Sequence, residues 1–204
     1  PGDTVGLGQK LGDGEGLCVP VHASVSGLVT AVEPRPHPGG GQVLSVVIEN
    51  DYQDTPASAL EPHLDLSGLT KEEIVSIIGE AGIVGMGGAT FPTDVKTVAG
   101  MGRVDTLIAN ACECEPYITA DDALLCTYPE QVLRGMGVLM AVLEPKRAVL
   151  AVEDNKPECI SLLKQLTRNE TKISVKALKT KYPQGAERQL IYATTGRKIN
   201  SSML

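Results

Sequence analysis

Arg147-Ala-Val-Leu-Ala-Val152 is a short apolar run of strand-forming residues, and it decides how the second half of the chain is expected to fold. Two similar runs, 104–109 and 172–178, lie before and after it. Strands that alternate with helices indicate a three-layer α/β domain with a mostly parallel sheet. Helices are predicted by length and apolar spacing at 129–143, 156–168 and 185–194.

Polar, turn-rich segments follow each of these predicted strands. They comprise residues 110–117, 153–155 and 182–185. Open parallel sheets bind ligands at the carboxyl ends of their strands. We therefore expect the three segments to converge on one edge of the sheet and to form a binding site there.

A second candidate ligand segment is Gly82-Ile-Val-Gly-Met-Gly-Gly-Ala-Thr-Phe-Pro-Thr93, which we expect to join that edge. A helix is predicted just before it, at 70–81, where Thr70 and Glu73 have capping-box spacing. Neither a dinucleotide fingerprint nor a Walker loop fits this spacing and context. The exposed amides of a glycine-rich loop can instead cradle a phosphate. Glycine content alone leaves open a tight surface loop between two helices.

The first part of the chain has a different pattern. Residues 1–55 are rich in Gly and Pro and contain short alternating runs, at 27–32 and 42–48, which are typical of an all-β domain. We predict a linker at 56–69 and the α/β domain at 70–204.

Composition excludes several classes of function. A net charge of −7 and only 3% aromatic residues argue against nucleic-acid binding. No apolar run is long enough to span a bilayer. The odd number of scattered cysteines argues against a disulfide framework and favours the cytoplasm. Neither a four-cysteine cluster motif nor ligand-spaced histidines are present, so we expect no metal site in this chain.

Three separated motifs carry a resemblance to a known family. They are Gly-Gly-Ala-Thr-Phe-Pro-Thr-x-x-Lys (87–96), Asn-Ala-Cys-Glu-Cys-Glu-Pro-Tyr-Ile-Thr-Ala-Asp (110–121) and Tyr-Pro-Gln-Gly-Ala-Glu (182–187). Together they resemble the C subunit of the Rnf electron-transport complex and, more distantly, the flavin-carrying, NADH-binding subunit of respiratory complex I. The segment 20–29 resembles biotinyl and lipoyl carrier domains, which are barrel-sandwich hybrids. Lys10 lies outside any hairpin tip, so no swinging arm is expected.

The resemblance implies a function, partners and a location. It implies noncovalent FMN binding and hydride exchange with NAD(H), coupled through ferredoxin-linked carriers and other Rnf subunits to ion movement across a membrane. The chain would lie peripherally on the cytoplasmic face of the cell membrane, and [4Fe-4S] clusters are expected only in a further C-terminal part. Two alternatives remain: a soluble Rnf C-like protein of an amino-acid reductase system, and a noncatalytic scaffold that has lost the flavin.

The resemblance also implies the cofactor-binding residues. They come from the glycine segment (Gly85, Gly87, Gly88, Ala89, Phe91, Thr93 and Lys96), the acidic segment (Asn110, Glu113, Glu115 and Tyr117) and the last motif (Gln184, Gly185 and Glu187). No catalytic side chain is expected, because the flavin itself accepts the hydride.

Several of these residues also have an ordinary structural interpretation. Lys96 would pair with the FMN phosphate or be a solvated helix lysine, and Asn110 would bind the flavin or simply end a strand. By the resemblance, Glu113 and Glu115 would contact hydroxyls of FMN or NADH. Asp121 is expected to cap a helix. Ala186 departs from the family pattern, which has glycine there, and Cys112 and Cys114 are expected to be packing thiols near the site.

Overall fold

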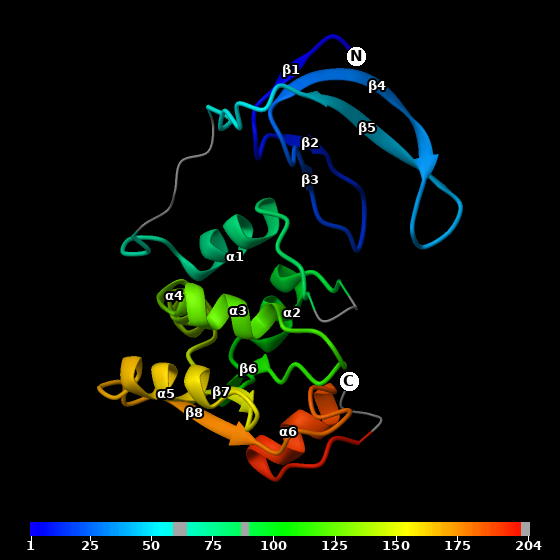
Figure 1. Cartoon of the computed structure of the whole chain (residues 1–204). Helices are drawn as coiled ribbons and strands as arrows, with labels where there is room; N and C mark the ends of the chain where they lie inside the picture. The colour runs from blue at the N-terminus through cyan, green and yellow to red at the C-terminus, as the bar shows by residue number, and fades with distance from the viewer. Residues whose placement is uncertain (59–64, 87–89, 201–204) are drawn as a thin grey trace. The chain divides into compact units, whose positions relative to one another are not determined.

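The computed structural model describes residues 1–58, 65–86 and 90–200, and the chain divides into two compact units, Pro1–Val98 and Ala99–Leu204 (Figure 1). Across these described ranges, no helix has the length and apolar character needed to cross a membrane. The predicted domain limits at residues 55 and 70 stay a prediction, and the predicted linker includes residues outside the described ranges.

The first unit opens with two small antiparallel sheets. One sheet has the strand order β1-β4-β5, and β2 pairs with β3 in the other. Val5, Ala23 and Val29 form the buried core between them. The predicted strands 27–32 and 42–48 are confirmed and extend further than expected. The five strands are β1 (Thr4–Val5), β2 (Lys10–Gly12), β3 (Val21–His22), β4 (Gly27–Pro36) and β5 (Gln42–Asn50).

Two helices, α1 (Lys71–Glu80) and α2 (Thr93–Gly100), flank the glycine segment. The predicted capping box of α1 is confirmed: the Glu73 amide donates to Thr70 Oγ1 at 3.2 Å, and the Thr70 amide donates to Glu73 Oε2 at 2.7 Å. The sequence anticipated α2 only as a helix after the loop that would carry Lys96, without bounds. Lys10, at the start of β2, pairs with Glu80 at 2.9 Å and takes part in a surface ion pair rather than standing on a hairpin tip.

The second unit is built on a three-stranded parallel sheet. Its strands β6 (Thr106–Ala111), β7 (Arg147–Glu153) and β8 (Ile173–Leu178) lie in the order β6-β7-β8, so the apolar run 147–152 belongs to the central strand. Every residue of β7 after Arg147 is buried. Burial of both faces explains the uninterrupted apolar sequence of this strand.

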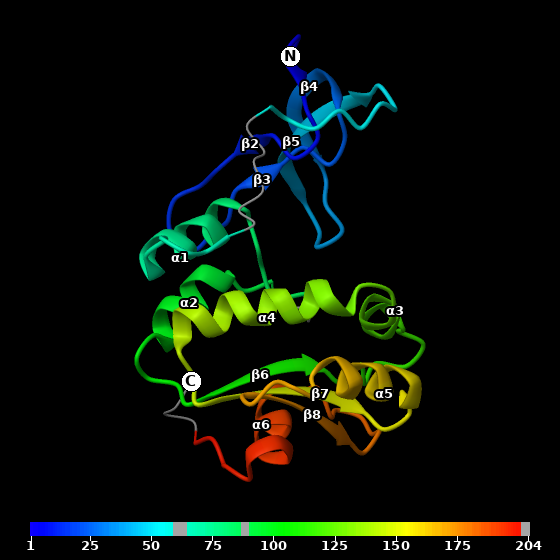
Figure 2. The same ribbon diagram turned by 90° about the vertical axis from the view of Figure 1, so that its left-hand side faces the viewer.

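Helices cover both faces of this sheet, which confirms the predicted three-layer α/β fold. Leu150 on β7 shares a core cluster with residues of α3 (Ala120–Thr127), α4 (Pro129–Leu143) and α5 (Pro157–Leu166). Ala151 faces the other way and packs with α6 (Glu187–Thr195). Figure 2 shows α3 and α4 on one side of the strands and α6 on the other. Three helices match their predictions closely, whereas α3 was anticipated only through the expected cap at Asp121, without bounds.

Candidate functional site

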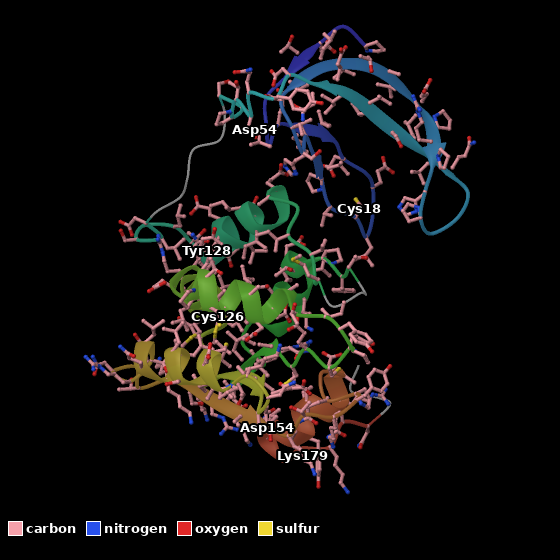
Figure 3. The ribbon with its side chains drawn as sticks, in the orientation of Figure 1. Cys18, Asp54, Cys126, Tyr128, Asp154 and Lys179 are labelled. Carbon is pink, nitrogen blue, oxygen red and sulfur yellow. The ribbon has the colours of Figure 1, made fainter. Side chains whose placement is uncertain are left out.

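The polar segments that follow the three parallel strands do converge, as the topology predicted. Asn110 Nδ2, near the end of β6, donates to the Gly185 carbonyl at 2.9 Å. Asp154, just after β7, accepts from the Thr180 amide at 2.9 Å and from its hydroxyl at 2.7 Å. Figure 3 shows Asp154 and Lys179 at this end of the sheet. Hydrogen bonds therefore join the first segment to the third, and the second to residues 180 and 181, which lead directly into the third.

Gly185 lies where this edge is most tightly packed. A Cβ atom at this position would clash with the Cys112 carbonyl oxygen, so no other residue fits without movement of the backbone. The Gly185 amide donates to Cys114 Sγ at 3.3 Å. The turn that carries Gly185 includes a cis peptide bond between Tyr182 and Pro183. Close approach to the protein's own backbone thus accounts for this glycine, and its predicted contact with a cofactor stays a prediction.

Two buried oxygen atoms at this edge have no hydrogen-bond partner among the described residues. They are Gln184 Oε1 and Glu153 Oε2, and the two side chains are only 2% and 1% exposed. The other oxygen of Glu153 accepts from the Lys181 amide at 3.2 Å. Unpaired acceptors in such positions are costly unless a donor reaches them. Gln184 was among the predicted site residues. Glu153 was not, although its place at the end of the central strand could have indicated it.

Glu113 is fully engaged within the protein. Its Oε1 accepts from the Asp121 amide at 2.8 Å, and its Oε2 accepts from the Asp122 amide at 3.4 Å and from Lys156 Nζ at 3.3 Å. Thr119, the residue before α3, makes no side-chain cap bond. Glu113, which lies several residues before α3 in the sequence, therefore caps the N-terminus of this helix with its side chain. The expectation that Asp121 is the cap was wrong, because Asp121 lies inside the helix and donates its amide to Glu113.

Electrostatics around this cap follow from burial and pairing. Burial first, and then the neighbouring charge of Glu113, raise the pKa of Asp121, while Lys156 opposes that rise. For Lys156, burial works against the charged form, but the hydrogen bonds and charges of Glu113 and Asp122 prevail and raise its pKa. Lys156 thus stays protonated and pairs with two carboxylates, Asp122 on α3 and Glu113, which caps that helix.

The other predicted residues of the acidic segment divide into engaged and exposed groups. Asn110 uses both ends of its amide inside the protein, since its Oδ1 also accepts from the Cys112 amide at 3.1 Å. Cys112 is buried, and burial, together with Glu153 and Cys114, raises its thiol pKa to about 12. Glu115 and Tyr117 are exposed. The roles of these residues toward a cofactor stay predictions, as does that of Glu187 in the first turn of α6.

The two ends of the glycine segment pair with each other in the first unit. Val84 and Pro92 form an antiparallel bridge, the Gly85 amide donates to the Phe91 carbonyl at 2.9 Å, and the Thr93 amide donates to the Ile83 carbonyl at 3.0 Å. Fewer backbone amides are therefore available to bind a phosphate than the sequence predicted, because the Gly85 and Thr93 amides already donate hydrogen bonds within the segment. Gly87, Gly88 and Ala89 lie outside the described residues.

The position of Gly82, where the glycine segment leaves α1, explains why this residue is glycine. This residue has φ +67° just after Ala81, the C-cap of α1, and a Cβ there would lie 2.7 Å from the Pro20 carbonyl oxygen. Gly82 therefore serves the end of the helix and its packing rather than a ligand. Phe91 is 43% exposed and Lys96 lies on the exposed side of α2. The loop belongs to the first unit and the sheet edge to the second, so their predicted meeting stays a prediction.

Comparison with protein families agrees with this architecture. Residues 78–204 match the family described as the Nuo51 FMN-binding domain, and residues 1–53 match the RnfC barrel sandwich hybrid domain. Two solved structures of an NAD⁺-reducing [NiFe]-hydrogenase, one air-oxidised and one H₂-reduced, are similar to 63% of this chain and 24% of theirs. Their TM-scores are 0.55 and 0.56, at 26% and 25% identity.

Two curated relatives extend the similarity over the whole chain. The C subunit of the Na⁺-translocating ferredoxin:NAD⁺ oxidoreductase complex of Acetobacterium woodii is 46% identical over 100% of this chain. The C subunit of the ion-translocating oxidoreductase complex of Serratia proteamaculans is 44% identical over 97%. The chain spans 46% and 28% of the lengths of these relatives. By the family match over residues 78–204, the chain belongs to the Nuo51 FMN-binding domain family, and over nearly its whole length it is similar to the C subunits of ion-translocating oxidoreductase complexes.

Proposed function

We propose that this chain binds FMN noncovalently and exchanges electrons between NAD(H) and ferredoxin-linked carriers as part of an ion-translocating complex. The observation that carries the proposal is the structure of the carboxyl edge of the parallel sheet. There, two buried oxygen atoms, Gln184 Oε1 and Glu153 Oε2, have no hydrogen-bond partner among the described residues. Next to them, Gly185 packs so closely against the backbone that no side chain would fit. The family match supports FMN as the ligand, because the matched domain is described as FMN-binding.

The residues at the edge fit the chemistry of a flavin. FMN offers a ring N–H and several ribityl hydroxyls, all of which can donate hydrogen bonds. Gln184 Oε1 and Glu153 Oε2 accept no hydrogen bond from the described residues, so these FMN groups could supply the missing donors. Glu115, which is exposed, remains a candidate for hydroxyl groups of NADH or FMN. We assign the phosphate to the tip of the glycine loop and to the start of α2, where helix amides and Lys96 favour an anion.

The protein's own contribution is to bind, orient and shield the cofactor. When bound, FMN supplies the redox chemistry, since it accepts a hydride and passes on electrons singly. The hydrogen bonds among Asn110, Gly185 and Cys112 fix the backbone of the edge before any ligand arrives. A preformed edge lowers the entropy cost of binding.

The relatives bear on the choice between the main proposal and its alternatives. Both are named as subunits of ion-translocating complexes, which favours a place in such a complex over a soluble protein of an amino-acid reductase system. We propose other Rnf subunits as partners and peripheral attachment, through them, to the cytoplasmic face of the cell membrane. We expect the [4Fe-4S] clusters in a further C-terminal part, beyond the stretch that this chain shares with its longer relatives.

Titration of the purified chain with FMN tests the proposal. We expect saturable binding of one FMN per chain, seen as a change in flavin fluorescence. Gly87→Val is expected to abolish the binding, because added side chains would block the amides of the loop tip, while circular dichroism stays unchanged. The matched control is Gly137→Ala on α4, where a Cβ meets open space. Absence of saturable binding in the parent chain would favour the scaffold, and unchanged affinity in Gly87→Val would remove the loop from the site.

A further inference from the structure

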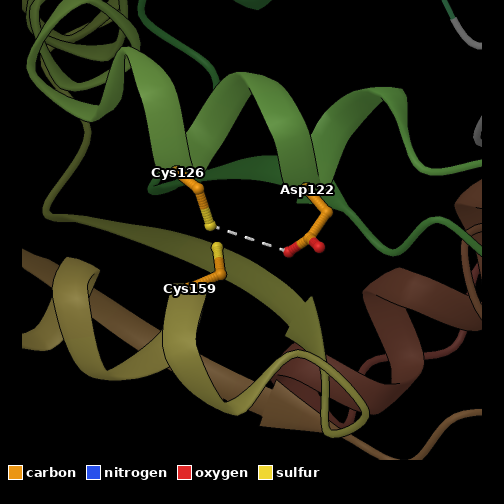
Figure 4. Close-up of side chains that lie close together, drawn as sticks. All are labelled: Asp122, Cys126 and Cys159. Atoms are coloured by element: carbon orange, nitrogen blue, oxygen red, sulfur yellow. Dashed lines mark hydrogen bonds between the residues drawn. The ribbon is translucent and has the colours of Figure 1, made fainter.

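A cluster of three metal-ligating side chains lies on the helical side of the second unit. Asp122 and Cys126 are one turn apart on α3, so they project from the same face of that helix. Cys159, in the first turn of α5, meets them from the opposite side, as Figure 4 shows. The carboxylate oxygen and the two sulfur atoms all lie within 4.8 Å of one another. Cys126 Sγ and Asp122 Oδ1 are 3.9 Å apart.

We propose that Asp122, Cys126 and Cys159 form a binding site for a thiophilic divalent cation of the zinc class. Zinc prefers thiolate, imidazole and carboxylate ligands in tetrahedral geometry, and a Zn–S bond of about 2.3 Å places two thiolates about 3.8 Å apart. The present separations therefore need to contract by about 1 Å at most. Side-chain rotation on two helices that already pack together can supply that movement.

The cluster is partly buried and partly open to solvent, as a site that binds an ion from solution requires. Cys159 is 1% exposed and gives the site a fixed, water-excluded wall. Cys126 is exposed, and the Asp122 side chain is 34% exposed, so an ion can enter from solvent. Three protein ligands leave the fourth tetrahedral position for a water molecule.

A divalent cation offsets most of the negative charge at the site. Two thiolates and one carboxylate carry three negative charges, and a divalent cation leaves one. Lys156 Nζ lies 3.6 Å from Asp122 Oδ2 and offsets part of that remaining charge from outside the ligand set, because it also pairs with Glu113. A cation held in this way would also connect α3 to α5 through bonds that neither helix can make alone.

Burial raises the pKa of the Cys159 thiol to about 12, Cys126 and Asp122 add to the rise, and Lys156 opposes it. A bound cation must displace the thiol protons, so affinity is expected to increase with pH. No metal site was expected from the sequence, because these three residues lack the close spacing of a metal-binding motif. They come from two helices that meet only in the folded unit.

Zinc binding to the reduced full chain tests the proposal. Competition with a chromophoric chelator gives the affinity, and X-ray absorption at the zinc edge gives the ligands. We expect one zinc per chain, with two sulfur neighbours at about 2.3 Å and oxygen neighbours at about 2.0–2.2 Å. Cys126→Ala is expected to weaken binding by more than the roughly 10- to 100-fold that loss of an outer-shell partner costs. Cys126 is exposed, so this variant should fold normally.

Cys18→Ala is the matched control, because Cys18 is also exposed but lies in the first unit. It is expected to bind zinc as tightly as the parent chain. Affinity that survives Cys126→Ala, a zinc shell without sulfur, or no binding at all to the reduced chain would each overturn the proposal. The FMN titration is performed in the presence of chelator, so failure of one proposal leaves the other intact.

Discussion

Lys156→Met is expected to lower the free energy of unfolding by about 3 kcal/mol, because it leaves a buried carboxylate without its cation. The Glu113 side chain is only 4% exposed, and Lys156, at 12%, is its cationic partner among the described residues. Methionine retains most of the aliphatic volume of lysine, so the loss of stability measures the effect of removing the positive charge. Urea unfolding of the parent and the variant, followed by circular dichroism, gives the difference.

Two further variants make this prediction specific. Lys164→Met removes an exposed lysine from the same helix, α5, and is expected to cost about 0.5 kcal/mol or less. Adding Glu113→Gln to Lys156→Met is expected to cost less than the sum of the two single changes, because the buried charge is gone. Equal losses in Lys156→Met and Lys164→Met would contradict the role we give to the pair.

The same pair predicts a dependence on pH. Burial opposes the charged form of Lys156, but Glu113 and Asp122 raise its pKa above the ordinary 10.5. A raised pKa means that the folded state holds the proton more tightly than the unfolded state does. The contribution to stability is therefore complete at neutral pH and is lost only as the pH rises through the alkaline range above 10.5. Lys156→Met should lack this alkaline loss.

Gly185→Ala is expected to destabilise the second unit by about 1–3 kcal/mol, the range for overpacking a tight site. The new Cβ would clash with the Cys112 carbonyl oxygen and push apart the segments that follow β6 and β8. We also expect FMN affinity to fall by more than about tenfold, because Gln184 moves with its neighbour and misplacing a binding group is costly. Thermal unfolding and the flavin titration measure the two effects.

The matched control for this variant makes the same chemical change elsewhere. Gly137→Ala, in the interior of α4, adds a methyl group into open space and is expected to raise stability by about 0.5–1 kcal/mol. The two variants should therefore change stability in opposite directions. A Gly185→Ala chain as stable as the parent would show that the edge can relax, and it would weaken our explanation of this glycine.

Much of the second unit could be predicted because its local patterns agree with its packing. The uninterrupted apolar sequence 147–152 reflects a central strand buried on both faces, and the spacing in 129–143 gave the bounds of α4. In contrast, α3 begins with two acidic residues in its first turn and has no local side-chain cap. Its cap is Glu113, which comes from a separate segment, and a contact of that kind leaves no periodic signal in the sequence.

The site was predictable at the level of topology but not of individual atoms. Parallel strands bring their carboxyl ends to one edge, so the convergence of three polar segments followed from the strand assignments alone. The sequence could not reveal that Asn110 and Glu113 use their polar atoms within the protein. Nor could it identify Glu153, whose burial depends on the layers above and below β7. Such pairings arise only when distant segments meet.

The most direct test of the flavin assignment is to map FMN onto the chain by amide NMR. With an isotopically labelled chain, we predict that added FMN shifts the amide signals of Gln184 and Gly185 and those of the loop tip, residues 86–91, along one common titration curve. The signals of β4 and β5 should stay unchanged. Shifts confined to β4 and β5, or a loop and a sheet edge that respond at different FMN concentrations, would contradict a single flavin site made by the loop and the edge.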